Sequence, residues 1–232
     1  MSEPALVSII IPALNEENFI ESLLQNLLAI PNTEIIVSDG GSSDNTGAIC
    51  AGYPVKFISS SRGRGPQLNA GAAAAAGEIL FFVHADSVIE PQLINEIRQA
   101  VKAGHHWGCC SLAFDNTALI FRIIAGLSNL RALLFSSCYG DQGIYCDRAL
   151  FYKVGPYPPA VFLEDMALSD RLRRSSRARV LKGRIGSSSR RFTRHGVWRT
   201  IVKMQAIKIM YRLGGKPESL VKWYHPGYEE QL

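Results

Sequence analysis

The amino-acid sequence predicts an α/β protein with a mostly parallel central sheet flanked by helices. Apolar runs end in acidic residues at three places, most clearly where Ile79-Leu-Phe-Phe-Val83 leads into His84-Ala-Asp86. An uninterrupted apolar strand is typical of a sheet that is buried on both faces. These runs alternate with helical segments at intervals of roughly 20–30 residues, which fits βαβ units and parallel pairing.

The elements of the first half follow from this alternation. Asn15 is suited to cap the first helix, Pro91 to begin the fourth, and Gly71 to let the third pack closely on the sheet. The expected strands are 6–11, 34–38, 55–59 and 79–83, and the expected helices lie near 17–29, 44–51, 66–76 and 91–103.

After residue 104 the pattern loosens, and no linker divides the chain, so we expect one domain. The last helix should end at Gly214, where glycines and a proline follow. In order, the sequence indicates a strand at 107–114, an amphipathic helix at 118–135, a glycine-rich turn at 139–143, a helix through 165–174, a short strand at 178–181 and a helix at 197–213.

The composition suits a globular protein with a local excess of positive charge. The 232 residues are 47% hydrophobic and carry a formal charge of +5, which is enough apolar material for one large core. Much of the basic excess lies between Arg171 and Arg199. Such a run can meet phosphates, nucleic acid or an anionic membrane, or it can be a solvated face. Nucleic acid is disfavoured because aromatic residues do not interleave with the basic ones.

The cysteines and the apolar segments indicate a cytosolic protein. The five cysteines are odd in number and lack metal-ligand spacing, so reduced thiols are expected. No secretory leader and no apolar run of 18 residues is found. The segment 118–135 comes nearest, but Arg122 and Asn129 interrupt it on one helix face. It is either a core or dimer helix, or it contacts an apolar acceptor or a membrane surface.

Three acids at predicted strand ends mark a ligand site, because open α/β sheets bind ligands at that edge. Asp39 can accept hydrogen bonds from a base or ribose, whereas helix capping fully explains Asp44. Asp86 is the strongest candidate to bind Mg²⁺ or Mn²⁺, which take hard oxygen ligands and share them with substrate phosphates. His84 alternates with Asp86 and can face the same crevice, or it can be a structural histidine.

Two further segments carry charged groups at predicted helix starts. Arg64 lies in a glycine-rich loop before a helix, where a guanidinium and helix amides suit phosphate oxygens, although a plain surface loop remains open. Glu164 and Asp165 open a later helix. The helix dipole alone could explain one acid, and the second is a natural general base for a hydroxyl nucleophile.

Together these segments resemble family 2 glycosyltransferases, which have the GT-A fold. The resemblance covers roughly residues 6–195, and five motifs occur in the family order. They are Ser8-Ile-Ile-Ile-Pro-Ala-Leu-Asn-Glu-Glu17, Ile35-Ile-Val-Ser-Asp39-Gly-Gly-Ser-Ser-Asp-Asn-Thr46, Asn69-Ala-Gly71, Phe82-Val-His-Ala-Asp86 and Leu163-Glu-Asp165.

The resemblance implies an inverting enzyme that uses a nucleotide-diphospho-sugar and a divalent cation, Mg²⁺ or Mn²⁺. Asp86 would bind the metal and the diphosphate, and Asp165 would be the catalytic base. The remaining residues expected to bind the nucleotide-sugar are Pro12, Ala13, Leu14, Glu16, Asp39, Arg64, Asn69, His84, Ala85, Asp141, Gln142, Glu164 and Arg191.

The chain departs from the family pattern at several of these positions. His84 replaces the first acid of the Asp-x-Asp motif, and Gly40 replaces an acid that is common in the second motif. Ser188-Ser-Arg-Arg191-Phe192 only half resembles the Gln-x-x-Arg-Trp motif of processive synthases, so polymer synthesis is not expected. Asp141 and Gln142 line a sugar or acceptor pocket, or form a plain turn.

The predicted protein is thus a single GT-A domain, 1–232, with a nucleotide-binding half at 1–103, an acceptor and catalytic half at 104–195 and a helical tail at 196–232. It would transfer one sugar, UDP-linked by preference, to an unknown hydroxyl acceptor. The alternatives are a polyprenyl-phosphate glycosyl synthase at the inner face of the membrane and a nucleotide-sugar-binding protein without catalysis. A homodimer is left open. The chain also resembles a small bacterial subgroup that is sometimes associated with arsenosugar synthesis.

Overall fold

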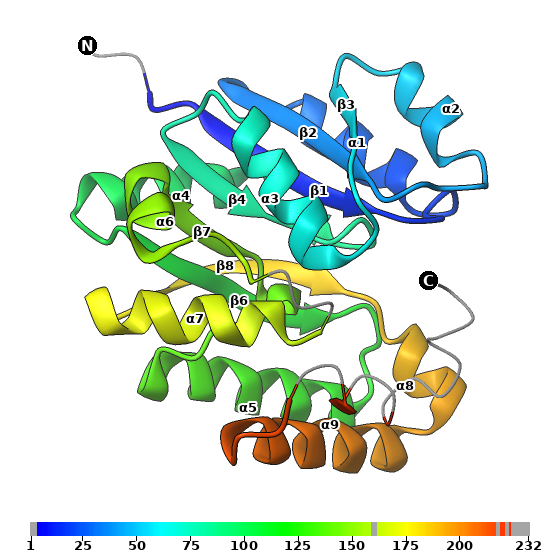
Figure 1. Cartoon of the computed structure of the whole chain (residues 1–232), viewed down its shortest axis with the longest axis vertical. Helices are drawn as coiled ribbons and strands as arrows, with labels where there is room; N and C mark the ends of the chain where they lie inside the picture. Colours follow the sequence, from blue (N-terminus) through cyan, green and yellow to red (C-terminus); the bar gives the residue numbers. More distant parts are fainter. Residues whose placement is uncertain (1–3, 159–161, 217–218, 221–222, 224–232) are drawn as a thin grey trace.

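The computed structural model describes residues 4–158, 162–216, 219–220 and 223. One eight-stranded sheet, in the order β3-β2-β1-β4-β7-β6-β8-β5, runs through the molecule with helices on its faces (Figure 1). The strands are β1 Val7–Ala13, β2 Thr33–Asp39, β3 Lys56–Ser59, β4 Ile79–Phe82, β5 Val88–Ile89, β6 Trp107–Phe114, β7 Ile144–Asp147 and β8 Arg179–Ser187. The helices are α1 Ile20–Leu28, α2 Thr46–Ala51, α3 Arg64–Ala74, α4 Pro91–Lys102, α5 Leu119–Phe135, the 3₁₀ turn η1 Gly140–Gln142, α6 Arg148–Val154, α7 Glu164–Ser175, α8 Arg190–His195 and α9 Val197–Arg212.

The first half of the sheet is parallel, as the alternation of strands and helices predicts. β1 pairs in parallel with β2 and with β4, and β2 pairs in parallel with β3. The chain therefore moves outward from β1 to β3 and then returns to the other side of β1. This reversal of strand order separates the loops that follow β1 and β4, which opens a crevice at the carboxyl edge.

The second half makes the sheet mixed. β7 runs antiparallel to both β4 and β6, whereas β6 and β8 are parallel and β5 is antiparallel to β8. The sequence did not predict β5, β7, α6 or α8. These elements have two to seven residues, which is too short for a hydrophobic period to appear.

Two apolar layers hold the helices to the sheet. On one face, α1 and α4 cover β1 and its neighbours, and α1 is amphipathic because Ile20, Leu23, Leu24 and Leu27 share one face and are buried. On the other face, α3, α6 and α7 pack on side chains such as Leu80 of the same strands. The central strand β4 lies between the two layers and is therefore apolar and buried at every position.

One predicted helix start is wrong and another is confirmed. Asn15 does not cap α1, which begins after Phe19. Asn15 instead has a positive φ of 55°, and its side chain accepts a hydrogen bond from the Ser43 amide. Pro91 lies in the first turn of α4, where its missing N–H leaves no helical bond unmade. In the part of the chain that the structure describes, no helix has the length and apolarity to span a membrane.

The glycines at 71 and 126 provide a matched test of helix packing. A Cβ at Gly71 would collide with the Ile10 side chain, whereas a Cβ at Gly126 of α5 would meet open space. We expect Gly71→Ala to lower the free energy of unfolding by about 1–3 kcal/mol because α3 must move off β1. Gly126→Ala should raise it by about 0.5–1 kcal/mol through helix propensity. Urea unfolding measures both changes in the free energy of unfolding. Changes of the same sign in the two variants would contradict this packing.

Candidate active site

A buried glutamine ties together the ends of β1 and β2, which form the floor of the crevice. Gln67 of α3 donates to the Ala13 carbonyl at 2.6 Å and to the Ser38 carbonyl at 3.0 Å. The Gly40 amide donates to the same Ala13 carbonyl at 2.9 Å. A Cβ at Gly40 would lie only 3.0 Å from the Gln67 amide. A side chain at position 40 would therefore crowd the Gln67 amide.

Asp39 organises the loop that leaves β2. Its Oδ2 accepts hydrogen bonds from the amides of Gly41 and Ser42, and its Oδ1 accepts one from the Ser42 hydroxyl. A carboxylate has about four lone-pair directions, so the buried Asp39 retains room for a further donor. Its expected contact with a base or ribose stays a prediction, but Asp39 also has a clear structural role.

Two carboxylates meet one guanidinium in the crevice between β1 and β4. The Arg190 side chain lies 3.1 Å from Oδ2 of Asp86 and 3.7 Å from Oε2 of Glu16, and it stacks over the Phe19 ring. Burial raises the pKa of Glu16, the charge of Arg190 opposes this rise, and Asp86 adds to it. The arginine expected from the sequence to bind the nucleotide-sugar is the neighbouring Arg191, whose side chain lies outside the described residues.

The same carboxylates suit a hard cation. Asp86 and Glu16 both present a carboxylate oxygen to the same Arg190 nitrogen, so their position already accommodates a positive charge. Among the described residues, no group of three or more His, Cys, Asp or Glu side chains could hold a metal ion. A divalent ion here would therefore depend on Asp86 together with oxygens from a bound phosphate ligand.

The turn η1 brings the end of β4 against the start of α7. The Gly140 amide donates to Oδ2 of Asp165 at 2.8 Å, and the Met166 amide donates to Oδ1 at 2.7 Å. A Cβ at Gly140 would lie 2.8 Å from Nε2 of His84 and 3.5 Å from Oδ2 of Asp165. His84 and Asp165, which lie far apart in the sequence, therefore face the same small space.

The two acids at the start of α7 have different surroundings. Glu164 is 2% exposed and lies 3.3 Å from the half-exposed guanidinium of Arg64. Burial raises the pKa of Glu164, the charge of Arg64 opposes this, and Asp165 adds to the rise. Although burial alone would lower the pKa of Arg64, the charges of Glu164, Asp165 and Asp86 raise it. Neither acid is the N-cap of α7, which is Leu163.

A second group of charged side chains adjoins Asp165. The Arg131 guanidinium lies 3.5 Å and the Lys208 ammonium 4.6 Å from the centre of the Tyr139 ring. Burial raises the pKa of Asp141, whose Oδ1 has no hydrogen-bond partner among the described residues. Burial lowers the pKa of Lys208 to about 8; Arg131 adds to this effect, while Asp141 and Asp165 oppose it. Arg131 and Lys208 were not among the residues expected from the sequence, because they project from helices that were recognised only by their apolar pattern.

Two expected ligand residues instead brace the site. Both polar atoms of the Asn69 amide bond the backbone of Tyr157. Gln142 is fully buried, and its Oε1 accepts from Arg131 while its amide donates to Asn129. Of the other expected residues, those that the structure brings to the carboxyl edge or the adjoining helix starts are Pro12, Ala13, Leu14, Glu16, Asp39, Arg64, His84, Ala85, Asp86, Asp141, Glu164 and Asp165.

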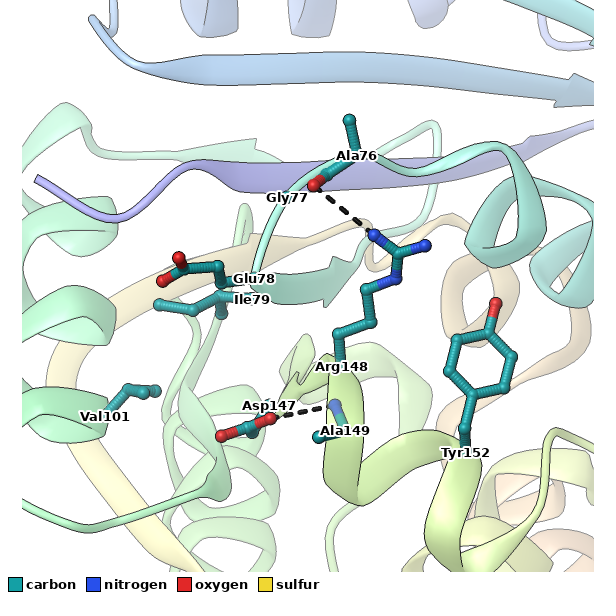
Figure 2. A pocket seen from close by; sticks show the side chains of 9 residues that line it. All are labelled: Ala76, Gly77, Glu78, Ile79, Val101, Asp147, Arg148, Ala149 and Tyr152. Atoms are coloured by element: carbon teal, nitrogen blue, oxygen red, sulfur yellow. Dashed lines mark hydrogen bonds between the residues drawn. The ribbon is translucent and has the colours of Figure 1, made fainter.

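Another depression lies at the opposite edge of the sheet (Figure 2). It has a volume of about 520 Å³ and is lined at the start of β4 by Gly77 and Glu78 and beyond β7 by Arg148 and Tyr152. Arg148 donates there to the Ala76 carbonyl. None of the expected site residues lines it, so the candidate active site is the carboxyl edge.

Comparisons with known proteins agree with this geometry. Residues 8–153 match the model of glycosyl transferase family 2. The glycosyltransferase GlyG of Streptococcus pneumoniae is 29% identical over 111 residues, which is 44% of this chain and 36% of the relative. The dolichol-phosphate mannosyltransferase of Pyrococcus furiosus is 33% identical over 107 residues, 42% of this chain and 30% of the relative. The chain thus matches about a third of the length of these relatives.

Solved glycosyltransferases share the fold. The mannosyltransferase PcManGT from Pyrobaculum calidifontis, in complex with GDP-Man and Mn²⁺, aligns with 93% of this chain and 66% of its own at a TM-score of 0.67 and 18% identity. S. aureus TarS in complex with UDP aligns with 79% of this chain and 60% of its own at a TM-score of 0.64 and 20% identity. The fold is therefore GT-A, and with the match over residues 8–153 the chain belongs to glycosyl transferase family 2.

Proposed function

We propose that this glycosyltransferase is an inverting, metal-dependent enzyme that moves one sugar from a nucleotide-diphospho-sugar, UDP-linked by preference, to an acceptor hydroxyl. The observation that carries the proposal is the position of Arg64, which lies 3.3 Å from Glu164. Although burial alone would lower the pKa of Arg64, the charges of Glu164, Asp165 and Asp86 raise it, so all three acids lie near this side chain. The carboxylate proposed for the metal–diphosphate and the carboxylate proposed as the base are therefore grouped near one basic side chain.

The donor would lie across the carboxyl ends of β1, β2 and β4. Asp39 and the loop after β1 would bind the nucleoside, since both lie at the carboxyl edge where open α/β sheets bind ligands. Asp86 would hold a Mg²⁺ or Mn²⁺ ion, and that ion would neutralise charge that develops on the leaving diphosphate. Arg64 and Arg190 are the guanidinium groups within the same crevice, and each can fork two phosphate oxygens. PcManGT binds the nucleotide-sugar GDP-Man and TarS binds the nucleotide UDP, and these complexes support a nucleotide-linked substrate.

Asp165 is proposed as the general base. The Gly140 and Met166 amides each use one lone pair of its carboxylate and fix its orientation, while the remaining lone pairs stay available for an acceptor hydroxyl. Asp165 would take the hydroxyl proton as that oxygen bonds the anomeric carbon and the bond to the diphosphate breaks. Attack from the side opposite the leaving group inverts the anomeric centre. Glu164 is excluded as the base because it is buried against Arg64.

The acceptor would enter over Asp141, Tyr139 and Lys208. The unpartnered Oδ1 of Asp141 can accept a hydrogen bond from an acceptor hydroxyl, and Lys208 can donate to a neighbouring oxygen. These groups adjoin Asp165 through Gly140, so an acceptor held there presents a hydroxyl to the base. The five free cysteines, all buried, support a reducing compartment such as the cytoplasm.

One observation favours a lipid-linked acceptor as a second candidate function. Leu127 and Leu134 of α5, with Val202 of α9, belong to a set of exposed apolar side chains on these helices. A polyprenyl phosphate would need such a surface beside the acceptor groups. Transfer to a polyprenyl phosphate but not to water-soluble alcohols, measured with radiolabelled donor, would favour this candidate over a soluble acceptor.

Calorimetric titration with UDP and GDP, each with and without Mn²⁺, tests the donor site. We expect UDP to bind at least about tenfold more tightly with Mn²⁺ than without it, because the ion links the diphosphate to Asp86. Asp86→Asn should remove this dependence. Glu78→Gln is the control, since Glu78 is an exposed carboxylate at the opposite edge. Absence of binding by either nucleotide, with or without Mn²⁺, would contradict the proposal.

Replacing the base should separate catalysis from binding. We expect Asp165→Asn to lower kcat by about 10²–10⁴-fold, the usual contribution of a general base, without weakening UDP binding. Asp170→Asn, on the same helix and in a surface ion pair with Arg173, should change neither quantity. The amount of UDP released from the donor measures both transfer and donor hydrolysis. Wild-type protein that binds UDP but never releases it from a donor would identify a binding protein without catalysis.

The pKa of Lys208 gives a pH signature of the acceptor side. Because burial lowers this pKa from 10.5 to about 8, the unfolded chain binds a proton that the folded chain lacks between these pH values. Lys208 therefore makes the free energy of unfolding rise with pH from 8 to 10.5. In urea unfolding, the free energy of unfolding of Lys208→Met should exceed that of wild type most strongly below pH 8. This difference should become smaller as the pH approaches 10.5. A difference independent of pH would contradict this burial.

A further inference from the structure

Helix α5 exposes a continuous apolar stripe. Its Phe121, Ala125 and Ala132 are buried against the body of the protein. The opposite face carries large apolar side chains at helical spacing, and each is about half exposed or more: Leu119, Ile123, Leu127, Leu130 and Leu134. A helix that is buried on one face and apolar on the other is not explained by the core alone, and isolated soluble proteins rarely expose such a stripe.

Helix α9 continues this surface. It exposes Trp198, Val202 and Ile209 at similar spacing. The two helices run side by side along one border of the molecule (Figure 1). The Phe121 ring of α5 packs on Phe192 of α8 just before α9 begins, and cations from α5 and α9 share the Tyr139 ring. We call the apolar side chains exposed on both helices the α5–α9 face.

The helices that form and flank the α5–α9 face carry charges of one sign. The sequences of α5, α8 and α9 contain no aspartate or glutamate, although they hold several arginines and lysines. Arg122, Arg194, Arg199 and Arg212 are exposed. The acids nearby come from other elements: Asp115 bonds Ser189 before α8, and Asp170 of α7 lies near Tyr211. Helices with an exposed apolar face and basic residues beside it are typical of the interface of an anionic membrane.

An arginine-lined depression adjoins the end of the stripe. It has a volume of about 550 Å³ and lies between Leu134 and Phe135 of α5 and the arginines that end α7. Arg173, Arg174 and Arg177 line it, and Arg177 also donates to the Leu133 carbonyl at 3.1 Å. A phospholipid carries its phosphate next to its acyl chains. Guanidinium groups can bind that phosphate while the exposed leucines beside them contact the chains.

A second copy of the chain fits this face less well. A twofold contact places the same patch of both copies together, so the arginines at its margins would oppose one another. No acid on α5, α8 or α9 could compensate them. An anionic bilayer supplies both an apolar layer for the stripe and negative charge for its margins.

We propose that the α5–α9 face docks the enzyme on the surface of an anionic phospholipid bilayer. α5 and α9 lie along the interface with their leucines, Val202 and Trp198 among the upper acyl chains, and the arginine-lined depression takes a lipid phosphate. The docked face is continuous with the candidate active site, because α8, whose Arg190 lies at Asp86, passes directly into α9 at Gly196. The crevice then opens beside the membrane surface.

Vesicle co-sedimentation tests the proposal with the full chain. We expect binding to vesicles of phosphatidylcholine mixed with phosphatidylglycerol and little binding to phosphatidylcholine alone. Leu127→Glu should weaken binding by about tenfold or more, since one buried leucine side chain is lost. Arg174→Gln with Arg177→Gln should weaken it by about 30-fold, the factor for two charges near an anionic surface. Raised salt should weaken wild-type binding as well.

Matched variants on other surfaces serve as controls. Phe57→Glu changes an exposed apolar side chain on β3, at the other end of the sheet, and Lys102→Gln with Lys153→Gln removes two exposed charges from α4 and α6. Both should bind like wild type. Circular dichroism melting verifies that each variant folds. Failure of wild type to bind anionic vesicles, or equal binding by Leu127→Glu and Phe57→Glu, would overturn the proposal. A wild-type dimer by light scattering that Leu127→Glu makes monomeric would assign the face to a second copy instead.

Discussion

The active-site edge depends on how the ends of β1 and β2 are held together. Two parallel strands that finish beside a crevice leave carbonyl groups that need donors. Gln67 supplies both donors from α3, and α3 can approach because Gly71 leaves room for Ile10. The Gln67 amide in turn crowds position 40, which favours glycine there. One buried amide therefore sets the spacing of the strands, the path of the following loop and the place of Asp39.

A turn of three residues assembles the side of the candidate site that holds the proposed base. η1 carries no metal-binding or nucleophilic motif, yet its Gly140 holds Asp165 and contacts His84. A larger residue at 140 would push apart the end of β4 and the start of α7. The glycine-rich sequence at 139–143 is thus a spacer between two functional segments, and the charged cluster of Arg131, Asp141 and Lys208 surrounds it.

The sequence predicted the first half of the fold well because long apolar strands alternate with helices there. It missed β7 and α6, which are too short for periodicity and owe their form to neighbours. Asp86 and Asp165 could be predicted as candidates because each follows a recognisable local pattern, and their roles stay predictions. Arg190 and Lys208 could not, since their importance lies in what tertiary packing sets beside them. Asn15 was misjudged because its loop needs a left-handed residue more than α1 needs a cap.

The ion pair between Arg190 and the two carboxylates affects the order in which ligands can arrive. A guanidinium that already neutralises Asp86 and Glu16 competes with any divalent ion that enters by itself. A diphosphate offers that guanidinium a new partner and brings oxygens for the ion. In the proposed mechanism, cation and nucleotide would therefore be thermodynamically coupled, each strengthening the affinity for the other. The Arg190 ion pair would then insulate the protein from changes in free cation concentration until the proposed donor binds.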